Sequence, residues 1–297
     1  MNISRPSLLS TGSAKGNFRF LSSTQPRTND TSDTFQPTNR LLGRTCMITG
    51  GTSGIGFAIA QRFLHEGASS IILVGRSQER LEAAAANLRS SDKVRLLVGD
   101  VAEAGTWMRE LEKEMTNVDV LVNAAGISVT NILPRCELED ISKILRTNLE
   151  GAILTSRALM RAAIRSRVRN RNAADGGKRL SRCIINISSL LALKAGTGAV
   201  PYAASKAGLL GLTRSVAVEA SASLKDVVIR SNAILPGYIE TPMIADFTPG
   251  EVGRLNDTIP LHRFGKPSEV ADAAVFLAQN EYANNCVLNL DGGLSAV

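Results

Sequence analysis

The stretch TGGTSGIG, residues 49–56, decides the fold class. It follows a short apolar run, TCMITG (45–50), and leads into FAIAQRFLHEG (57–67), which has the character of an amphipathic helix. Gly50, Gly54 and Gly56 allow a tight strand-to-helix turn and a close approach of the backbone to a pyrophosphate, which the free amides of a helix N-terminus bind. A purely structural turn would carry the same glycines. The stretch by itself therefore predicts a strand followed by a helix, and dinucleotide binding is one of two interpretations.

The same alternation of short β-branched runs and longer amphipathic stretches continues from Leu41 onward. Parallel strands joined by helical crossovers produce this pattern. Runs such as SIILVG and VDVLVN are apolar without alternation, as expected of strands covered on both faces. We predict a single α/β domain over residues 41–297, of Rossmann type, with a doubly wound parallel seven-stranded sheet and helices on both faces. The strands are predicted at 45–50, 70–75, 94–100, 118–126, 183–189, 227–235 and 286–292.

The composition narrows the possible classes of protein. The chain has 297 residues, of which 44% are hydrophobic and 21% charged, as in an ordinary globular domain. No apolar run approaches the roughly 20 residues that cross a bilayer, so no membrane span is predicted. The four cysteines are far apart, without a CxxC pair or a Cys/His cluster, which favours reduced thiols and no metal site. The modest positive charge does not indicate nucleic acid as a partner.

Residues 1–40 differ in kind from the rest of the chain. They are rich in Ser, Thr and Asn, and they hold five basic and two acidic residues, a net +3 of the chain's +7. They lack the apolar core of about seven or more residues that a secretory signal needs. We predict a disordered leader that is a mitochondrial presequence, and hence a location in the mitochondrial matrix. A disordered tail without a targeting role, on a cytoplasmic protein, is the alternative.

The end of the second predicted strand indicates which dinucleotide would be bound. About twenty residues after Gly56, where an NAD site presents Asp or Glu to the ribose 2′-hydroxyl, stands Arg76, followed by Ser77. A guanidinium suits a 2′-phosphate, and the serine hydroxyl can donate a further hydrogen bond. The sequence therefore predicts NADP(H) as the cofactor. A solvated arginine at a strand end is the alternative.

Two further strand ends carry polar groups. Asp100, in VGDV, can accept a hydrogen bond from an adenine amino group. Asn123 begins NAAG (123–126), in which Ala124 and Gly126 leave room for a nucleotide to pass close to the backbone. Both Asp100 and Asn123 can equally be turn residues that satisfy their own backbone.

The segment AVPYAASKAGLLGLTRSVAVEA (199–220) is predicted to be a helix that carries the chemistry. Tyr202 and Lys206 are four positions apart, so they project from one face of it. A free phenol has a pKa near 10, and a nearby ammonium is expected to lower the pKa of Tyr202. Ser189, at the end of the strand predicted at 183–189, is placed to bind a carbonyl oxygen while Tyr202 gives it a proton.

These motifs together resemble the short-chain dehydrogenase/reductase family, over residues 43–297. They occur in the family's order: TGGTSGIG, NAAG, TNLEG, ISS, YAASK, PGYIETPM and LDGG. The resemblance implies a catalytic tetrad of Asn148, Ser189, Tyr202 and Lys206. In it Tyr202 is the general acid in reduction, Lys206 also holds the nicotinamide ribose, and Asn148 supports a proton-relay water.

The resemblance also implies a set of cofactor contacts and a substrate lid. Pro236, Gly237, Ile239 and Thr241 would line the nicotinamide, and residues 238–262 would form the lid. The full set of implied cofactor contacts is Gly50, Thr52, Ser53, Gly54, Ile55, Gly56, Arg76, Ser77, Asp100, Val101, Asn123, Ala124, Gly126, Tyr202, Lys206, Pro236, Gly237, Ile239 and Thr241.

Within the family, the chain looks most like 3-oxoacyl-acyl-carrier-protein reductases and the mitochondrial carbonyl reductase type. This implies NADPH-dependent reduction of a 3-oxoacyl thioester, linked to acyl-carrier protein, in type II fatty acid synthesis, by a homotetramer or a heterotetramer with a related subunit. One alternative is a broad carbonyl or quinone reductase, or another alcohol dehydrogenase with the same tetrad. The lid sequence lacks an aromatic wall for a steroid. The other alternative, of a different class, is a catalytically silent, cofactor-binding partner subunit.

Four features depart from the family's pattern. Residues 161–182 hold seven arginines and one lysine against a single acid, so they either dock an acidic acyl-carrier protein or form a solvated basic loop. Val218 stands where these reductases usually have an arginine for the carrier. Ala124 replaces a common asparagine, and YANNC (282–286) replaces the usual Ile-Thr-Gly. Asn285 tolerates a left-handed backbone better than most residues, so we expect only a local adjustment there.

Overall fold

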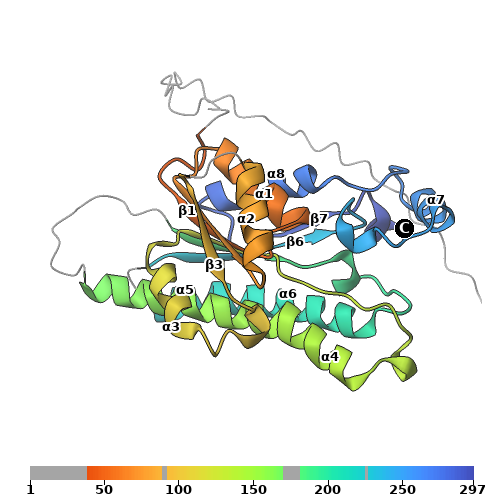
Figure 1. Ribbon diagram of the computed structural model, residues 1–297, viewed down its shortest axis with the longest axis horizontal. Coiled ribbons are helices and arrows are strands. Elements are labelled where there is room, and N and C mark those ends of the chain that lie inside the picture. The colour runs from red at the N-terminus through yellow and green to blue at the C-terminus, as the bar shows by residue number, and fades with distance from the viewer. Residues whose placement is uncertain (1–38, 89–91, 170–180, 225–226) are drawn as a thin grey trace, which may run out of the picture. The chain divides into compact units, whose positions relative to one another are not determined.

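A single parallel sheet of seven strands organises the chain, in the order β3-β2-β1-β4-β5-β6-β7 (Figure 1). The computed structural model describes residues 39–88, 92–169, 181–224 and 227–297. Every predicted strand is present, and each paired neighbour runs parallel. The strands are β1 Thr45–Thr49, β2 Ser70–Gly75, β3 Val94–Val98, β4 Val120–Asn123, β5 Arg182–Ile187, β6 Ile229–Pro236 and β7 Val287–Leu290. The predicted fold class, a Rossmann-type doubly wound sheet, is confirmed.

Helices cover both faces of this sheet. One face carries α1 Gly54–His65, α2 Gln78–Leu88 and α8 Pro267–Gln279, and the other carries α3 Met108–Glu114, α5 Gly151–Arg169 and α6 Val200–Ser223 (Figure 1). A hydrophobic core lies on each face of the sheet, and alternate side chains of β1 point into one or the other. Cys46 and Ile48 lie in the core on the α1 face, while Met47 lies in the core on the α5 face. Because both faces are buried, the central strands need apolar residues at every position.

Two further helices and several single turns complete the structure. They are α4 Leu138–Leu145, α7 Pro249–Thr258, the π-helical turn η5 Arg146–Glu150, and the short turns η2 Val101–Glu103, η3 Met115–Asn117, η4 Leu133–Arg135, η7 Leu190–Ala192, η8 Pro242–Ile244 and η9 Leu294–Ala296. Among the described residues, no helix combines the length and the apolar character needed to cross a bilayer.

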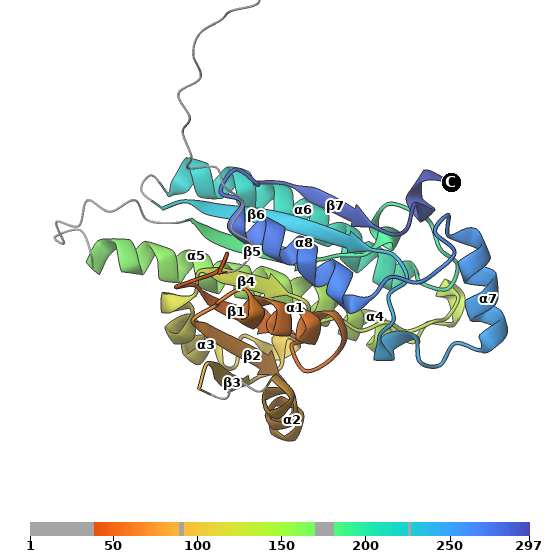
Figure 2. The ribbon, with the colours of Figure 1, turned by 90° about the horizontal axis from the view of Figure 1, so that it is seen from above.

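The carboxyl ends of all the strands lie at one edge of the sheet. Figure 2 shows the strand arrows pointing toward α7, which lies beyond this edge. The chain order reverses between β1 and β4, which are neighbours although two strands separate them in sequence. In open α/β sheets ligands bind at such a switch point, outside the carboxyl ends of the strands. The fold therefore places the ends of β1, β4, β5 and β6 around one candidate site.

The fourth strand is shorter than predicted. It ends at Asn123, whereas the sequence indicated 118–126. The backbone amides of Ala124 and Ala125 both donate to the hydroxyl of Thr49, each at 3.2 Å, instead of continuing the ladder. The small residues of NAAG thus leave the sheet and turn across the end of β1.

The segment before β7 makes the expected local adjustment. Asn285 has a φ of 57°, in the left-handed region. Its amide donates to the carbonyl of Ser231 at 2.8 Å, and the amide oxygen of Asn284 accepts from the Ser231 amide at 3.0 Å. Although YANNC differs from the usual family sequence, the residues just before β7 therefore remain hydrogen-bonded to β6.

Candidate active site

The turn between β1 and α1 is packed so closely that its glycines have no substitutes. A Cβ on Gly50, whose φ is +68°, would lie 2.8 Å from the Cα of Ala125. A Cβ on Gly56 would lie 2.4 Å from the carbonyl oxygen of Gly50. The N-cap residue Ser53 makes no side-chain bond to the first turn of α1. The leading amides of the helix are therefore not capped by Ser53, which suits an anion.

The turn between β1 and α1 also lies close to the segment after β6 and to the end of β2. A Cβ on Gly54 would lie 3.3 Å from the Cγ2 of Thr241, which follows β6. Thr52 lies beside the end of β2, where its methyl would be 3.2 Å from a Cβ on Gly75. The predicted contacts of residues 50–56 thus lie in one turn, between the end of β2 and the segment after β6.

The end of β2 presents a cation to solvent. Arg76 has a side chain that is 56% exposed, and its Nη1 lies 3.8 Å from Oδ2 of Asp100. This is a loose ion pair that leaves most of the guanidinium available. The hydroxyl of Ser77 accepts from the amide of Arg80 at 3.2 Å, so it starts α2 and can still donate. The predicted 2′-phosphate pair is therefore in place at the strand end.

The side chains of Asp100 and Asn123, at the two polar strand ends, make different kinds of hydrogen bonds. Asp100 caps the turn η2 by accepting from the amide of Ala102 at 2.9 Å, and Val101 is buried beneath it. The Asn123 side chain is buried, and its amide donates to Asn186 at 2.9 Å and accepts from Thr155 at 2.7 Å. Its side chain therefore belongs to a polar network that joins β4, β5 and α5. Only its backbone remains for a cofactor contact.

Tyr202 and Lys206 project from the first turns of α6, as predicted. The ammonium of Lys206 lies 5.6 Å from the centroid of the Tyr202 ring. It donates to the carbonyl of Ile187, at the end of β5, at 2.8 Å. Burial lowers the pKa of Lys206 from 10.5 to about 8. The lysine is therefore fixed between the helix and the strand that leads to Ser189.

The expectation that Lys206 lowers the pKa of Tyr202 is wrong for this structure. Burial raises the pKa of Tyr202 above 10, and a hydrogen bond with Ser189 opposes the rise. Burial dominates because a phenolate would lose its hydration there, and the opposing hydrogen bond with Ser189 is the smaller effect. The raised pKa keeps the phenol protonated at neutral pH.

Ser189 follows β5 and begins the turn η7. Its hydroxyl accepts from the amide of Leu191 at 3.2 Å, which holds the side chain at the strand end. Next to it, the hydroxyl of Ser188 donates to the carbonyl of Lys206 at 2.7 Å, so β5 and α6 are tied together at this level. Ser189 and Tyr202 thus approach from two elements that are locked to each other.

Asn148 lies in the π-helical turn η5, between α4 and α5. It is buried, accepts from the amide of Ile127 at 2.8 Å, and donates to the carbonyl of the same residue at 2.9 Å. It also donates to the hydroxyl of Ser205, the neighbour of Lys206, at 3.0 Å. The extra residue of a π turn re-aims a side chain out of a regular helix. Asn148 therefore links the loop after β4 to α6.

Gly126 lies close to two residues of the tetrad, Lys206 and Asn148. A Cβ at this position would lie 3.3 Å from Nζ of Lys206 and 3.5 Å from Oδ1 of Asn148. The open face of Gly126, beside the ammonium, is a cradle that a side chain would fill. Together with the glycine turn and the strand-end arginine, this cradle fits a dinucleotide.

The segment after β6 supplies the remaining predicted contacts. Pro236 ends β6, and a Cβ on Gly237 would lie 2.8 Å from Cα of Asp291. Ile239 is buried and pairs with Gly265, and Thr241 begins η8. The segment predicted to form the substrate lid, residues 238–262, contains α7. Its start and its return are joined by bonds from the amides of Gly265 to Tyr238 and of Glu240 to Gly265, both 2.9 Å.

The sequence analysis missed an aromatic cluster at the base of this lid. The ring of Tyr238 stacks on Phe264 with centroids 5.5 Å apart, and it meets the edge of Phe247 at 6.3 Å. Tyr238 and Phe247 fall within the predicted lid, residues 238–262, whereas Phe264 follows it. The sequence does not show that the rings meet, because the fold brings Phe264 back against the start of the lid.

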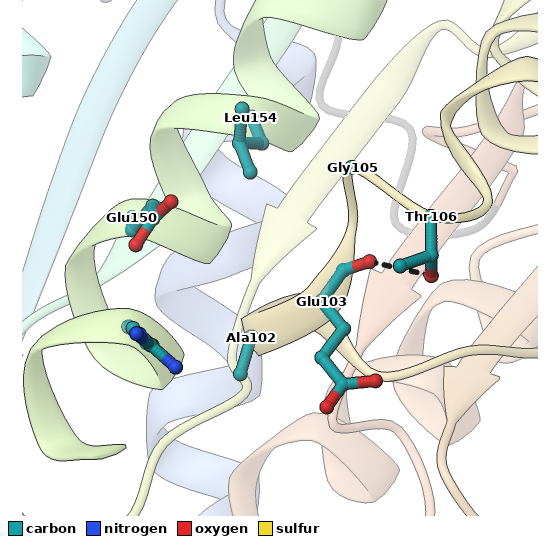
Figure 3. Close-up of a pocket in the computed structure, with 7 residues that line it drawn as sticks. Ala102, Glu103, Gly105, Thr106, Glu150 and Leu154 are labelled. Carbon is teal, nitrogen blue, oxygen red and sulfur yellow. Dashed lines mark hydrogen bonds between the residues drawn. The ribbon is translucent and has the colours of Figure 1, made fainter. Parts of the chain in front are cut away.

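A hollow of about 470 Å³ lies beside η2 and η5 (Figure 3). Thr106 donates to the carbonyl of Glu103 at its rim, at 2.8 Å. The predicted site residues do not line it. Its lining is Ala102, Glu103, Gly105, Thr106, Arg146, Glu150 and Leu154.

Residues 44–251 match the family model described as short chain dehydrogenase. The chain belongs to the short chain dehydrogenase family. It is therefore an oxidoreductase of that family, and its site is one that binds a nicotinamide cofactor.

Relatives and solved structures agree with this assignment. The chain is 36% identical over 259 residues to the human 3-oxoacyl-[acyl-carrier-protein] reductase, covering 86% of this chain and 100% of that one. It is 33% identical over 262 residues to the 3-oxoacyl-[acyl-carrier-protein] reductase of Chlamydia muridarum, covering 86% and 98%. Its fold is similar to that of a putative NAD(P)-dependent gluconate 5-dehydrogenase from Beutenbergia cavernae with bound NADP. That likeness has a TM-score of 0.76 and 30% identity, and it covers 86% of this chain and 98% of the other.

The lowered pKa of Lys206 predicts how cofactor binding depends on pH. The ammonium prevails below about pH 8 and is lost as the pH rises through that value. Because the charged form attracts the ribose and phosphates, the Kd for NADPH should rise roughly tenfold between pH 7.0 and 9.5. Quenching or enhancement of NADPH fluorescence in a titration measures this. A Lys206→Met variant, which has no ammonium to lose, should bind weakly with little pH dependence over the same range. A flat profile for the unmodified protein would contradict the assignment of Lys206.

Proposed function

We propose that the protein reduces a 3-oxoacyl thioester to the 3-hydroxyacyl thioester with NADPH, as in type II fatty acid synthesis. The observation that carries this proposal is the convergence of Asn148, Ser189, Tyr202 and Lys206 at the end of β5, under a lid with an apolar inner side. The names of relatives at 33–37% identity support the same substrate class.

Each residue of the tetrad has a distinct task. The cofactor, when bound, supplies a hydride. Ser189 donates a hydrogen bond to the carbonyl oxygen of the substrate, and Tyr202 gives that oxygen its proton. The raised pKa of Tyr202 fits this role, because reduction requires the phenol in its protonated form. Lys206 supplies positive charge beside the phenol as it becomes a phenolate, and Asn148 fixes the loop after β4 to α6.

NADP(H) is the proposed form of the cofactor. Arg76 and Ser77 stand at the end of β2, and most of the Arg76 guanidinium is exposed. A bidentate donor at this place pairs with a 2′-phosphate, whereas a ribose 2′-hydroxyl needs an acceptor.

The lid favours an acyl chain. Val252 and Leu255 of α7 and Ile244 of η8 pack on a cluster that contains Leu190, the residue after Ser189. An apolar surface thus begins beside the serine and continues along the lid. A flexible hydrocarbon chain attached to a 3-oxo group can follow that surface.

A broader carbonyl or quinone reductase is a second candidate. The stacked pair Tyr238 and Phe264 lies under the lid, and flat aromatic rings of this kind can receive a quinone. A catalytically silent subunit is a weaker alternative, because a protein that only binds cofactor does not need a buried phenol and ammonium at this spacing.

The basic segment 161–182 has a limited role in this proposal. Residues 170–180 lie outside the described residues. The segment leaves α5 and returns at Arg182, where β5 begins, whereas Ser189 lies beyond the other end of that strand. A strand of this length spans roughly 20 Å, so Arg182 lies at the opposite end of β5 from the reaction. Binding of acyl-carrier protein is proposed through the substrate's thioester arm and not through this segment alone.

We also propose a tetramer, either of identical chains or with a related subunit, in the mitochondrial matrix. Phe276 of α8 and Val287 of β7 are more than two-fifths exposed on one side of the molecule, and Leu138 of α4 is 82% exposed on another. Large exposed apolar side chains on two faces suit two interfaces. Light scattering that gives a monomer would refute the tetramer.

The predicted presequence, residues 1–40, lies almost wholly outside the described residues. If a reporter protein fused to it stays in the cytosol, the proposed location in the mitochondrial matrix is refuted.

A substrate comparison tests the proposed function. NADPH oxidation is followed with the acetoacetyl group on acyl-carrier protein, the same group on coenzyme A, and a simple quinone. The proposal expects both thioesters to be reduced, with the higher kcat/KM for the carrier-bound one. A strong preference for the quinone would establish the broad reductase instead. Inactivity with all three would favour the silent subunit.

A further inference from the structure

Ser189 lies at the start of a tight turn, residues 189–194, which ends at Lys194. After Ser189, the amides of Leu193 and Lys194 both donate to the carbonyl of Leu190 at 2.9 Å. The turn therefore closes on itself within six residues, and Lys194 stands at its far end. Lys194 and Ser189 are thus the two ends of one short, hydrogen-bonded stretch.

The ammonium of Lys194 reaches a segment a hundred residues away. It donates to the carbonyl of Leu294 at 2.7 Å and also to the carbonyl of Val297. These oxygens belong to η9 and the residue that follows it, so they are at the carboxyl end of a helical turn. Such carbonyls lack partners within the turn, and a cation is favoured there. An ammonium has three donors and can satisfy both at once.

Hydrogen bonds fix the 291–297 turn both internally and to the segment that follows β6. Asp291 accepts from the amides of Gly293 at 3.0 Å and Ser295 at 2.9 Å, which fixes the turn internally. On the cofactor side, the amide of Gly237 donates to Leu290 at 2.9 Å, directly before the turn. The turn is therefore a rigid support beside the predicted nicotinamide contacts.

Apolar contacts reinforce the same arrangement. Leu294 is buried in one cluster with Leu190, next to the serine, and with Ile259 and Phe264 at the return of the lid. A Cβ on Gly292 would lie 2.7 Å from Cγ2 of Ile259. The 291–297 turn thus lies between the serine turn and the base of the lid, and Lys194 adds a charged bond to this packing.

We propose that Lys194 is a positioning residue for Ser189, because it ties the serine turn to the 291–297 turn. The inference rests on the proposed function, since it gives Ser189 a part in the reduction. Lys194 touches neither the tetrad nor, in this proposal, the substrate. It acts by holding the serine hydroxyl where it can meet a carbonyl oxygen.

A double-mutant cycle in the full chain tests the proposal. Lys194→Met keeps the aliphatic stem and removes the donors, so kcat for acetoacetyl-coenzyme A should fall about tenfold while the KM for NADPH stays within about twofold. Lys194→Arg, which restores the donors, should recover most of the loss. Lys93→Met, at an exposed position in a different part of the chain, is the control and should change nothing. If Lys194→Met does not give folded protein, Lys194→Gln replaces it.

The decisive comparison is made in a Ser189→Ala background. If Lys194 acts through the serine, Lys194→Met should cost less than about twofold further when the serine hydroxyl is already absent. An equal loss of kcat in both backgrounds, or no loss in either, would overturn the proposal. If the protein reduces the quinone and not the thioester, the same cycle is run with the quinone.

Hydrogen exchange separates this proposal from the proposed function, because it needs no substrate. In Lys194→Met, the amides of residues 189–199 should exchange faster than in the unmodified protein, while those in the middle of α6 should be unchanged. Faster exchange in a protein that reduces none of the probes would refute the proposed function and leave the tie intact. Unchanged exchange at residues 189–199 would refute the tie, whatever the activity.

Discussion

Replacing Tyr202 with Phe should lower kcat for reduction by about 10³-fold and leave the Kd for NADPH within about threefold. The change removes one oxygen atom, so the packing of the ring at the start of α6 is kept. What disappears is the proton donor, which burial holds in the protonated form at neutral pH. Stopped-flow or steady-state NADPH oxidation gives kcat, and a fluorescence titration gives the Kd.

The chain provides a matched control for this variant. It has three tyrosines, and Tyr282 is 97% exposed, far from the tetrad in sequence. Tyr282→Phe removes the same atom and should leave kcat unchanged. If Tyr202→Phe retains its turnover, the proton comes from elsewhere and the proposed roles of Ser189 and Lys206 lose their basis.

Replacing Arg76 with Asp should weaken NADPH binding about a hundredfold while NADH binding changes by less than about threefold. The guanidinium that would pair with the 2′-phosphate is lost, and a carboxylate takes its place, which repels the phosphate and can accept from a 2′-hydroxyl. The side chain is more than half exposed and its ion pair with Asp100 is loose, so the fold should tolerate the change. Parallel titrations with the two cofactors measure the ratio.

A charge control accompanies the Arg76 variant. Arg214→Asp, at an exposed position on α6, makes the same change in net charge elsewhere and should affect both cofactors equally and little. Equal weakening of NADPH and NADH by Arg76→Asp would remove Arg76 from the 2′-phosphate site, and the preference for NADP(H) would need another explanation.

The strands could be predicted because their burial is visible in the sequence. A strand covered on both faces cannot alternate, and SIILVG and VDVLVN do not. The ends of strands were less predictable. The predicted fourth strand ran on through NAAG to residue 126, but the amides of Ala124 and Ala125 bond to the Thr49 hydroxyl, and those bonds depend on the neighbouring strand β1.

The site residues that follow strand ends or share a helix face were also accessible from the sequence. Tyr202 and Lys206 are one helical turn apart, and Arg76 occupies a position that the dinucleotide fold defines. By contrast, nothing local marks the π turn that aims Asn148, or the burial that raises the pKa of Tyr202. These depend on how α4, α5 and α6 pack.

Contacts across long separations escaped prediction altogether. Lys194 meets Leu294 across a hundred residues, and the aromatic cluster joins Tyr238 to Phe264 around the lid. From the sequence, Asn123 could be a cofactor contact or a turn residue, and its side-chain amide instead bonds to Asn186 and Thr155 in the interior. A strand-end residue can face either way, and only the neighbouring strands decide which.

The fate of the transferred hydrogen tests the central claim most directly. The protein is incubated with acetoacetyl-coenzyme A and NADPH that carries deuterium at both hydrogen positions of nicotinamide C4, and the product is analysed by mass spectrometry. If the protein reduces 3-oxoacyl thioesters, 3-hydroxybutyryl-coenzyme A forms with deuterium bound to C3, and in Tyr202→Phe its rate of formation falls by about 10³-fold. Unlabelled product, or no 3-hydroxyacyl product while the labelled cofactor is consumed with a quinone, would contradict the account.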